Sequence, residues 1–316
     1  MHDKLRLSLD KSQGILANSR IVYLMLYAND LEASRAFYEV MLGLRLIEAD
    51  KSSAKYDTGQ TILCLNRAAD YGVKLARRDY TADLTFLVDN LDGVRATLAK
   101  RGVEFSETLR YEIGATVNFY DPDGRSISLY EPSTVAMSWP SGEKIRAVST
   151  AGGKSAKGYG GAGSGLEGRE LIYLFLFVPD AEVAFDFYHG ALGLHHLECR
   201  PCRRGSTDHE RGVVKYDAGG IMLTTHLSQS AGQPPEVGAL QRKGIAPVYH
   251  VTDVEAVVEA LAQKAIHSGG VVQSESGVMA RFEDPFGRVF YLHEPFLDTL
   301  QTRRGAKLAQ ILAARL

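Results

Sequence analysis

The chain has 316 residues, of which 45% are hydrophobic and 23% charged, with a formal net charge of −2 and a pI near 6.5. This length is enough for two domains that each bury a core. The near-neutral charge gives no electrostatic basis for binding nucleic acid or a membrane surface. The longest apolar run, 171–178, is too short to span a bilayer, and the first residues lack the apolar stretch of a secretory signal. Three cysteines argue against a disulfide framework, so we expect a cytoplasmic protein.

Taken in chain order, the first elements are a strand, a helix and three short strands. The continuous apolar run 21–28 predicts a strand that is covered on both faces. Asp30 can cap the helix that follows, and Gly43 suits the left-handed residue just past its end. Short strands are expected near 44–49, 53–58 and 61–66, with turn residues between them.

The same order of elements recurs along the chain. A second unit has a strand at 83–88, a helix at 91–101 and strands near 104–111, 115–120 and 126–131. Three segments of the first half then recur in the second half: Val22-Tyr-Leu-Met-Leu as Ile172-Tyr-Leu-Phe-Leu, Lys55-Tyr-Asp as Lys215-Tyr-Asp, and Asp121-Pro-Asp-Gly-Arg as Asp284-Pro-Phe-Gly-Arg. So many matches in one order indicate a duplication, with units at 171–226 and 246–294. We therefore expect an α+β fold of four βαβββ units that form two cupped mixed sheets.

The repeat also sets the expected boundaries. We divide the chain into an N-terminal extension 1–20, a first domain 21–132, a flexible linker 133–170, a second domain 171–296 and a C-terminal helix 297–316. Gly158, Gly160 and Gly163 match G-x-G-x-x-G, but no predicted strand precedes them, so a flexible linker is favoured over a nucleotide-binding loop. Each domain is expected to close its own cup, as a monomer or a homodimer.

These motifs together resemble the vicinal oxygen chelate superfamily of glyoxalases, bleomycin-resistance proteins and extradiol dioxygenases. The resemblance rests on the apolar strand, Asp30, Phe37-Tyr38, Leu42-Gly43-Leu44, and Asp121-Pro-Asp-Gly with a terminal Glu131-Pro132, and it covers about 21–132 and 171–295. It implies paired βαβββ units in a cupped sheet, usually with a divalent metal on the floor. In such proteins the metal chelates vicinal oxygens of the substrate.

The resemblance also places eight metal-ligand positions on this sequence, most of them occupied by poor ligands. The positions fall on Tyr23, Leu63, Asp83, Ser128, Tyr173, Leu223, Ala246 and Tyr291. Asp83 is the one good ligand for a hard divalent ion, and three or more are usual. We therefore expect no metal and no cofactor, as in drug-sequestering members of the superfamily.

Alternation along the strands predicts which residues face the two cavities. The second cavity is expected to contain Tyr173, Phe175, Phe177, Leu223, His250, Tyr291 and His293, and the first Tyr23, Tyr27, Asp83, Ser128 and Tyr130. Apolar walls with a few polar groups suit a flat aromatic ligand, although ordinary packing of these aromatic residues is an open alternative. His226 is expected on the opposite face from Leu223, outside the cavity.

Two histidines are the candidate catalytic residues. His250 and His293 lie on strands that adjoin in this fold, and histidine is the usual acid or base near neutral pH. Ligation of a displaced metal and a purely structural role remain alternatives. The two Leu-Gly-Leu copies are 150 residues apart but the two Lys-Tyr-Asp copies 160, so the second half carries a ten-residue insertion between them. Cys199-Arg-Pro-Cys202 in this inserted segment is weak evidence for zinc or redox chemistry, because a second well-spaced pair is missing.

The favoured function is therefore metal-independent binding of a small aromatic or polycyclic compound. The protein would either sequester this compound or convert it by acid–base chemistry, so the sequence leaves open whether it is an enzyme. The alternative is a divalent-metal-dependent lyase, isomerase or extradiol-type dioxygenase.

Overall fold

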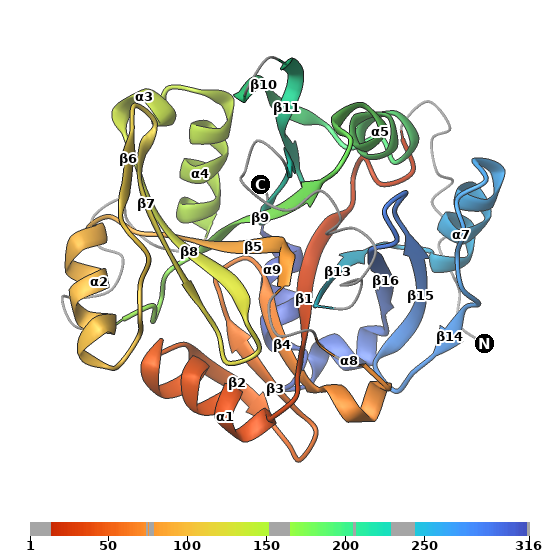
Figure 1. Cartoon of the computed structure of the whole chain (residues 1–316). Coiled ribbons are helices and arrows are strands. Elements are labelled where there is room, and N and C mark those ends of the chain that lie inside the picture. The colour runs from red at the N-terminus through yellow and green to blue at the C-terminus, as the bar shows by residue number, and fades with distance from the viewer. Residues whose placement is uncertain are drawn as a thin grey trace.

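The computed structural model describes residues 14–73, 75, 79–151, 165–204, 207–228 and 244–314. Four βαβββ units follow one another along the chain, which confirms the predicted α+β fold (Figure 1). The first unit has β1 (Arg20–Ala28), α1 (Leu31–Ala36), the π-helical segment η1 (Phe37–Met41), β2 (Arg45–Ala49), β3 (Ser53–Asp57) and β4 (Ile62–Arg67). After the short helix η2 (Ala68–Tyr71), the second has β5 (Asp79–Leu87), α2 (Leu91–Lys100), β6 (Leu109–Tyr111), β7 (Gly114–Tyr120) and β8 (Arg125–Pro132).

The second half repeats this pattern. The third unit has β9 (Leu171–Val178), α5 (Ala181–Phe185), the π-helical segment η3 (Asp186–Ala191), β10 (His196–Arg204), β11 (Thr207–Asp217) and β12 (Met222–Leu227). The fourth has β13 (Ile245–His250), α7 (Val254–Gln263), β14 (Val272–Gln273), β15 (Gly277–Glu283) and β16 (Val289–Pro295). Each half ends in two helices, which are α3 (Thr134–Met137) and α4 (Pro140–Ala151), and α8 (Leu297–Gln301) and α9 (Ala306–Ala313).

Local sequence signals fix the helix ends. Asp30 caps α1 by accepting a hydrogen bond from the Ala33 amide at 3.0 Å, as predicted. Asn90, Asp180 and Asp253 cap the first helix of the other three units in the same way. Gly43 has a φ of 72°, a left-handed conformation that glycine adopts at low cost.

Each of the two sheets combines strands from the first half of the chain with strands from the second half. Sheet A has the strand order β14-β15-β16-β13-β1-β4-β3-β2, and sheet B has the order β10-β11-β12-β9-β5-β8-β7-β6. The first unit therefore pairs with the fourth through antiparallel β1 and β13, and the second with the third through β5 and β9 (Figure 1). The expectation that residues 21–132 and 171–296 each close their own cup is wrong. Because each half supplies one unit to each sheet, neither half holds a complete sheet.

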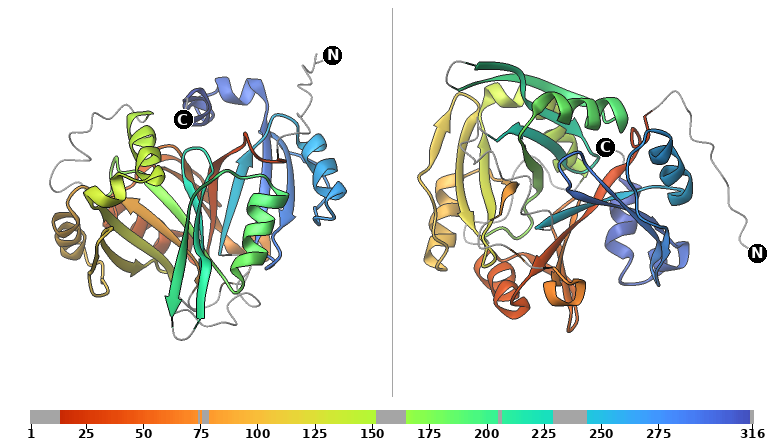
Figure 2. Two further views of the ribbon diagram at one scale, coloured as in Figure 1. Left: turned by 90° about the horizontal axis from the view of Figure 1, so that it is seen from above. Right: turned by 45° about the vertical axis from the view of Figure 1, so that its right-hand side comes forward.

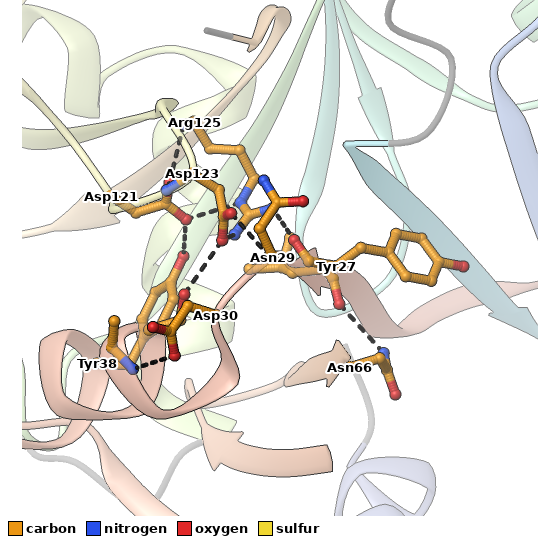
Figure 3. Close-up of polar contacts among 11 residues, drawn as sticks. Tyr27, Asn29, Asp30, Tyr38, Asn66, Asp121, Asp123 and Arg125 are labelled. Atoms are coloured by element: carbon orange, nitrogen blue, oxygen red, sulfur yellow. Dashed lines mark hydrogen bonds and ion pairs between the residues drawn. The ribbon is translucent and has the colours of Figure 1, made fainter. Parts of the chain in front are cut away.

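The Asp-Pro-x-Gly-Arg motif joins the two sheets. Arg125 at the start of β8 in sheet B donates to Asp121 at 2.7 Å and to Asp123 at 3.0 Å, and also to the carbonyl of Tyr27 in sheet A (Figure 3). The Tyr38 hydroxyl donates to the same Asp121 carboxylate at 2.7 Å. Arg125 is 1% exposed, so this ion-pair network is buried. The motif that most strongly marks the family resemblance therefore has a structural role here.

The second copy repeats this connection with one carboxylate fewer. Arg288 pairs with Asp284 at 3.1 Å and donates to the carbonyl of Phe177, and Tyr188 donates to Asp284 at 2.7 Å. Phe286 stands where the first copy has Asp123. One continuous hydrophobic core, formed by both sheets and by α1, α2, α5 and α7, surrounds these two buried networks.

Two predicted segments differ from the structure. The linker expected at 133–170 contains α3 and α4, because Ile145 and Val148 give α4 a buried apolar side. Residues 152–164, which include the glycine-rich stretch, lie outside the described residues. The C-terminal helix expected at 297–316 is divided into α8 and α9, the blue helices at the end of the chain (Figure 2). Within the described part of the chain, no helix has both the length and the apolarity needed to cross a bilayer.

Candidate functional site

Each sheet has one face against the helices and one cupped face, and alternation assigns residues to them. In β1, Leu24 and Leu26 join the main core, whereas Tyr23 and Met25 belong to a separate cluster on the opposite face. We call the latter face of sheet A cup A and the matching face of sheet B cup B. Cup A presents Tyr23, Met25, Tyr27, Cys64, Ala246, Val248, His250, Met279, Arg281, Tyr291 and His293, according to the strand register. Cup B presents Asp83, Thr85, Asn118, Ser126, Ser128, Tyr130, Tyr173, Phe175, Phe177, Thr224 and His226.

The C-terminal helix α9 covers one half of cup A. Leu308 and Ile311 are 1% and 0% exposed and pack against the cup face of β1 and β4. The Lys307 ammonium pairs with Asp57 of β3 at 2.8 Å. Arg20 donates to the Ile311 carbonyl at 2.6 Å, which satisfies an acceptor at the end of the helix. The first unit therefore has its side of cup A filled by a helix from the second half.

The helix α4 covers the corresponding half of cup B. Ile145 and Val148 pack against the cup face of β9 and β12. Lys144 pairs with Asp217 of β11 at 2.9 Å, and Asp217 is the repeat counterpart of Asp57. Beneath the helix, Lys215 donates to the Ser141 hydroxyl at 3.0 Å. Among the described residues, α4 and α9 leave uncovered the half of each cup that the second or fourth unit forms.

The uncovered half of cup A contains a cavity of about 410 Å³. It is lined by Gly269, Gly270, Val272, Met279, Ala280, Arg281 and Tyr291. The Tyr291 phenol lies close to that of Tyr27, whose ring also makes an edge contact with Tyr71 at 5.3 Å between centroids. Burial is the main cause that raises the pKa of the Tyr27 phenol, so it stays protonated at neutral pH.

The two candidate catalytic histidines lie side by side in cup A. His250 of β13 is the register partner of His293 of β16, and the His293 ring lies 5.9 Å from that of Tyr23. His293 is 4% exposed, and neither ring nitrogen has a hydrogen-bond partner of good geometry among the described residues. Burial lowers the pKa of His293 to about 4, with a further contribution from His250, while the nearby backbone of Ser276 opposes the shift. Burial and Arg20 likewise lower the pKa of His250 to about 4, so both rings are neutral at pH 7.

The uncovered half of cup B has a buried carboxylate at its centre. Asp83 is 4% exposed and accepts hydrogen bonds from the Ser126 hydroxyl at 2.6 Å and the Ser128 hydroxyl at 2.8 Å. The Thr85 hydroxyl at 2.8 Å and the Asn118 amide at 3.3 Å complete the set. Burial raises the pKa of Asp83, and these four hydrogen bonds act against that shift.

The structure regroups the residues that the sequence assigned to the two cavities. His250, Tyr291 and His293 share cup A with Tyr23 and Tyr27, whereas Tyr173, Phe175 and Phe177 share cup B with Asp83, Ser128 and Tyr130. The reason is that each sheet combines one unit from each half of the chain. Leu223 and Leu63 were also misplaced, because both pack in the main core on the helix side. The cup positions beside them are Thr224 and Cys64, and His226 faces the cup next to Phe177 at 5.9 Å between rings.

Comparison with known proteins agrees with this architecture. The family model described as the glyoxalase/bleomycin resistance protein/dioxygenase superfamily matches residues 20–129. Glyoxalase I from Zea mays has a TM-score of 0.56 at 16% identity, covering 94% of this chain and 96% of that one. A candidate dioxygenase from Bacillus subtilis has a TM-score of 0.58 at 14% identity, with the same coverage. The family match over residues 20–129 and the shared fold support membership of the vicinal oxygen chelate superfamily.

A sequence relative in this superfamily is metapyrocatechase 2 from Cupriavidus necator. It is 33% identical over 178 residues, which are 48% of this chain and 51% of that protein. The chain thus spans about half the length of this relative. The structural likenesses, at 14% and 16% identity, show the fold alone.

The divalent metal that vicinal oxygen chelate proteins usually hold does not fit the residues at the floor of either cup. In cup A, burial raises the pKa of the Tyr23 phenol and raises the pKa of the Cys64 thiol to about 12, so both stay protonated at neutral pH. In cup B, burial likewise raises the pKa of Tyr173, which leaves Asp83 with neutral Ser128. A hard divalent ion needs several charged or strongly donating ligands to offset its lost hydration. Within the described ranges, no three His, Cys, Asp or Glu residues form a group suited to a metal.

The cysteine pair lies in an elongated hairpin. The ten-residue insertion extends β10 and β11, and Cys199 is exposed on β10. A thiol pair on a strand lacks the helix N-terminus that usually activates a redox pair. The side chain of Cys202 lies outside the described residues.

Sequence reasoning missed α4, the position of the C-terminal helix over cup A, and Arg281. The helices had a signal, because Gly142-Glu-Lys-Ile145 recurs as Gly305-Ala-Lys-Leu308 at the same offset of 163 that separates Asp121 from Asp284. This match predicts that the duplication continues past the last strand of each half. Arg281 had no comparable signal, because its repeat counterpart is Asn118 and the motif around it is not conserved in the other copy.

Proposed function

We propose that the protein binds a small organic molecule with an aromatic body in the uncovered half of cup A. The cavity of about 410 Å³ beside Tyr291 and Met279 carries this proposal, and His293 is the register partner of Met279. Its volume lies in the range of sites for small molecules, and its walls combine apolar surface with a few polar groups. The ligand would be held without a divalent ion, since the floor residues are poor ligands for one.

The polar groups of this cup define what the ligand should offer. A neutral His293 can accept a hydrogen bond from an acidic hydroxyl and donate one from its other ring nitrogen. Its ring nitrogens are buried without good partners in the described part of the chain, and a ligand that pairs with them removes that cost. Arg281 at the rim is positioned for a carbonyl or carboxylate. A phenol or an enol with a second oxygen fits this arrangement, and a substrate with an acidic proton could transfer it to His293.

Native mass spectrometry of freshly purified protein tests the proposal directly. We expect a non-covalent adduct that carries an aromatic group, or, failing that, thermal stabilisation by members of a library of phenolic compounds. His293→Ala should weaken binding of that compound at least about tenfold, the loss expected for a hydrogen bond worth about 1.4 kcal/mol. Tyr130→Phe is the matched control, because Tyr130 occupies the corresponding position of cup B. Unchanged binding by a folded His293→Ala variant would contradict the proposal.

The similarity to metapyrocatechase 2 favours a second candidate function, that of a divalent-metal-dependent dioxygenase. Elemental analysis of the purified protein separates the two. Stoichiometric iron or manganese, and loss of ring-cleaving activity on chelation, would support this second function in place of the first.

A further inference from the structure

The floor of cup B holds a buried carboxyl group, Asp83, that faces no cationic side chain among the described residues. Asp83 makes no ion pair within the described ranges, and its partners are three hydroxyls and one amide, all of them neutral. Neutral donors stabilise an ionised carboxylate but leave its net charge in place. A buried carboxylate with an uncompensated charge attracts a cation strongly, because the surrounding dielectric screens the charge poorly.

The hydrogen bonds are distributed unevenly over the two carboxylate oxygens. Oδ2 accepts from Asn118, Ser126 and Ser128, whereas Oδ1 accepts from Thr85 alone among the described residues. A carboxylate has about four lone-pair directions, two on each oxygen. Oδ1 therefore keeps one direction for a further donor.

Aromatic residues share the face of cup B with Asp83. Asp83 of β5 is the register partner of Phe175 of β9, and Phe175 lies 5.5 Å from Tyr173 between ring centroids. Phe177 follows on the same face. Phe175 and Phe177 are half-buried, in contrast to Tyr173 under α4, so their outer parts remain accessible. Aromatic faces beside a carboxylate are a recurring way to bind an organic ammonium ion, since the ring quadrupole and the anion both attract it.

Cup A provides an internal comparison. At the offset of 163, Asp83 corresponds to Ala246 and Asn118 corresponds to Arg281. The same two places in the duplicated architecture therefore carry an acid and an amide in one cup, and an alanine and a cation in the other. The two cups consequently favour ligands of opposite charge.

We propose that cup B is a second binding site, specific for an organic ammonium ion whose apolar body rests on Phe175 and Phe177 and whose N–H group donates to Oδ1 of Asp83. This site is separate from the one proposed in cup A. Its ligand differs in charge, and its residues come from the second and third units rather than the first and fourth.

Ligand-observed NMR titration of the full chain with phenethylammonium tests this proposal, with phenethyl alcohol as a neutral probe of similar shape. We expect the ammonium probe to bind more tightly than the alcohol. Asp83→Asn should weaken the ammonium probe at least about tenfold, the size of a desolvated charge–charge contact, and leave the alcohol unchanged. Asp92→Asn is the matched control, because it removes an equal charge from an exposed carboxylate of α2, and it should change neither affinity.

A second variant keeps the test decisive if Asp83→Asn does not fold. Phe175→Leu retains the carboxylate and removes an aromatic face, so it should weaken the ammonium probe several-fold more than the alcohol. The proposal is overturned if the wild-type protein binds both probes equally, or if it binds neither. It is also overturned if folded Asp83→Asn or Phe175→Leu retains the wild-type preference for the ammonium ion.

Discussion

The chain contains two copies of the Asp-Pro-x-Gly-Arg motif, so the contributions of two buried ion-pair networks to the free energy of unfolding can be compared within one molecule. Arg125 compensates two buried carboxylates, Asp121 and Asp123, which are 5% and 8% exposed, whereas Arg288 compensates Asp284 alone. Removing one partner of a buried pair typically costs about 3–5 kcal/mol, because the remaining charge is left in a poorly screened environment. We therefore expect Arg125→Met to lower the free energy of unfolding by about 5 kcal/mol and Arg288→Met by about 3 kcal/mol.

Urea unfolding monitored by far-ultraviolet circular dichroism at pH 7 would measure both losses. Arg110→Met serves as the control, since Arg110 and Asp92 form a pair at 2.8 Å that is 59% and 68% exposed. Its loss should be under about 1 kcal/mol. Adding Asp123→Asn to Arg125→Met should recover part of the stability, because the second uncompensated charge is then gone. Equal losses for the two arginine variants, or a loss at Arg125 no larger than at Arg110, would refute the reasoning.

Three further results are expected. The pKa of His293 is about 4 in the folded protein and about 6.5 when unfolded, so the unfolded chain binds the extra proton in this pH range. The free energy of unfolding should therefore fall by about 3 kcal/mol as the pH drops from 6.5 to 4. His293→Phe should flatten the dependence of urea midpoints on pH, and an identical slope would contradict this. Burial raises the pKa of Cys64 to about 12, so the Cys64 thiol should resist a thiol reagent at pH 8. Leu308→Ala in the covering helix α9 should speed the modification of Cys64. Equal rates would show that α9 does not shield Cys64. Tag-free protein should hold less than about 0.2 equivalents of Mn, Fe, Co, Ni or Zn, and chelation should leave its melting temperature unchanged; stoichiometric metal would contradict the assignment of the cup floors.

The sequence predicted the individual elements well because their signals are local. The strand expected at 53–58 is β3 (Ser53–Asp57), and the helix expected at 91–101 is α2 (Leu91–Lys100). Capping residues, left-handed glycines and alternation all act within a few residues, so they survive in a single sequence. The superfamily resemblance followed from the order of these elements.

The pairing of units could not be predicted in the same way. The alternation of side chains along a strand shows that Tyr23 and Met25 share a face. It does not determine whether β1 pairs with a strand of its own half or with one of the other half. Both arrangements bury the same apolar faces. The choice depends on long-range contacts, such as that of β1 with β13, which a single sequence does not encode locally. The cavity assignments failed for this reason.

The placement of Leu63 and Leu223 failed for a different reason. Successive residues of a strand point to opposite faces, so an error of one residue moves a position from the cup to the core. The metal-ligand position of the superfamily in the fourth strand has no sequence motif of its own here, so its place depends on the exact residue at which the strand begins. The cup residues at that place are Cys64 and Thr224, neither of which is a charged ligand at neutral pH.

The exchange of units also explains why each half ends in a covering helix. A cup built from units of both halves exposes apolar residues of the first or third unit, such as Ile62 in cup A and Met222 in cup B, and the helix that covers them comes from the opposite half. Lys144 of the first half pairs with Asp217 of the second, and Lys307 of the second half pairs with Asp57 of the first. Each half thus completes a cup that the other half begins. Because α4 and α9 fill equivalent halves, the open halves carry the charged residues that differ between the copies, such as Asp83 in cup B and Arg281 in cup A.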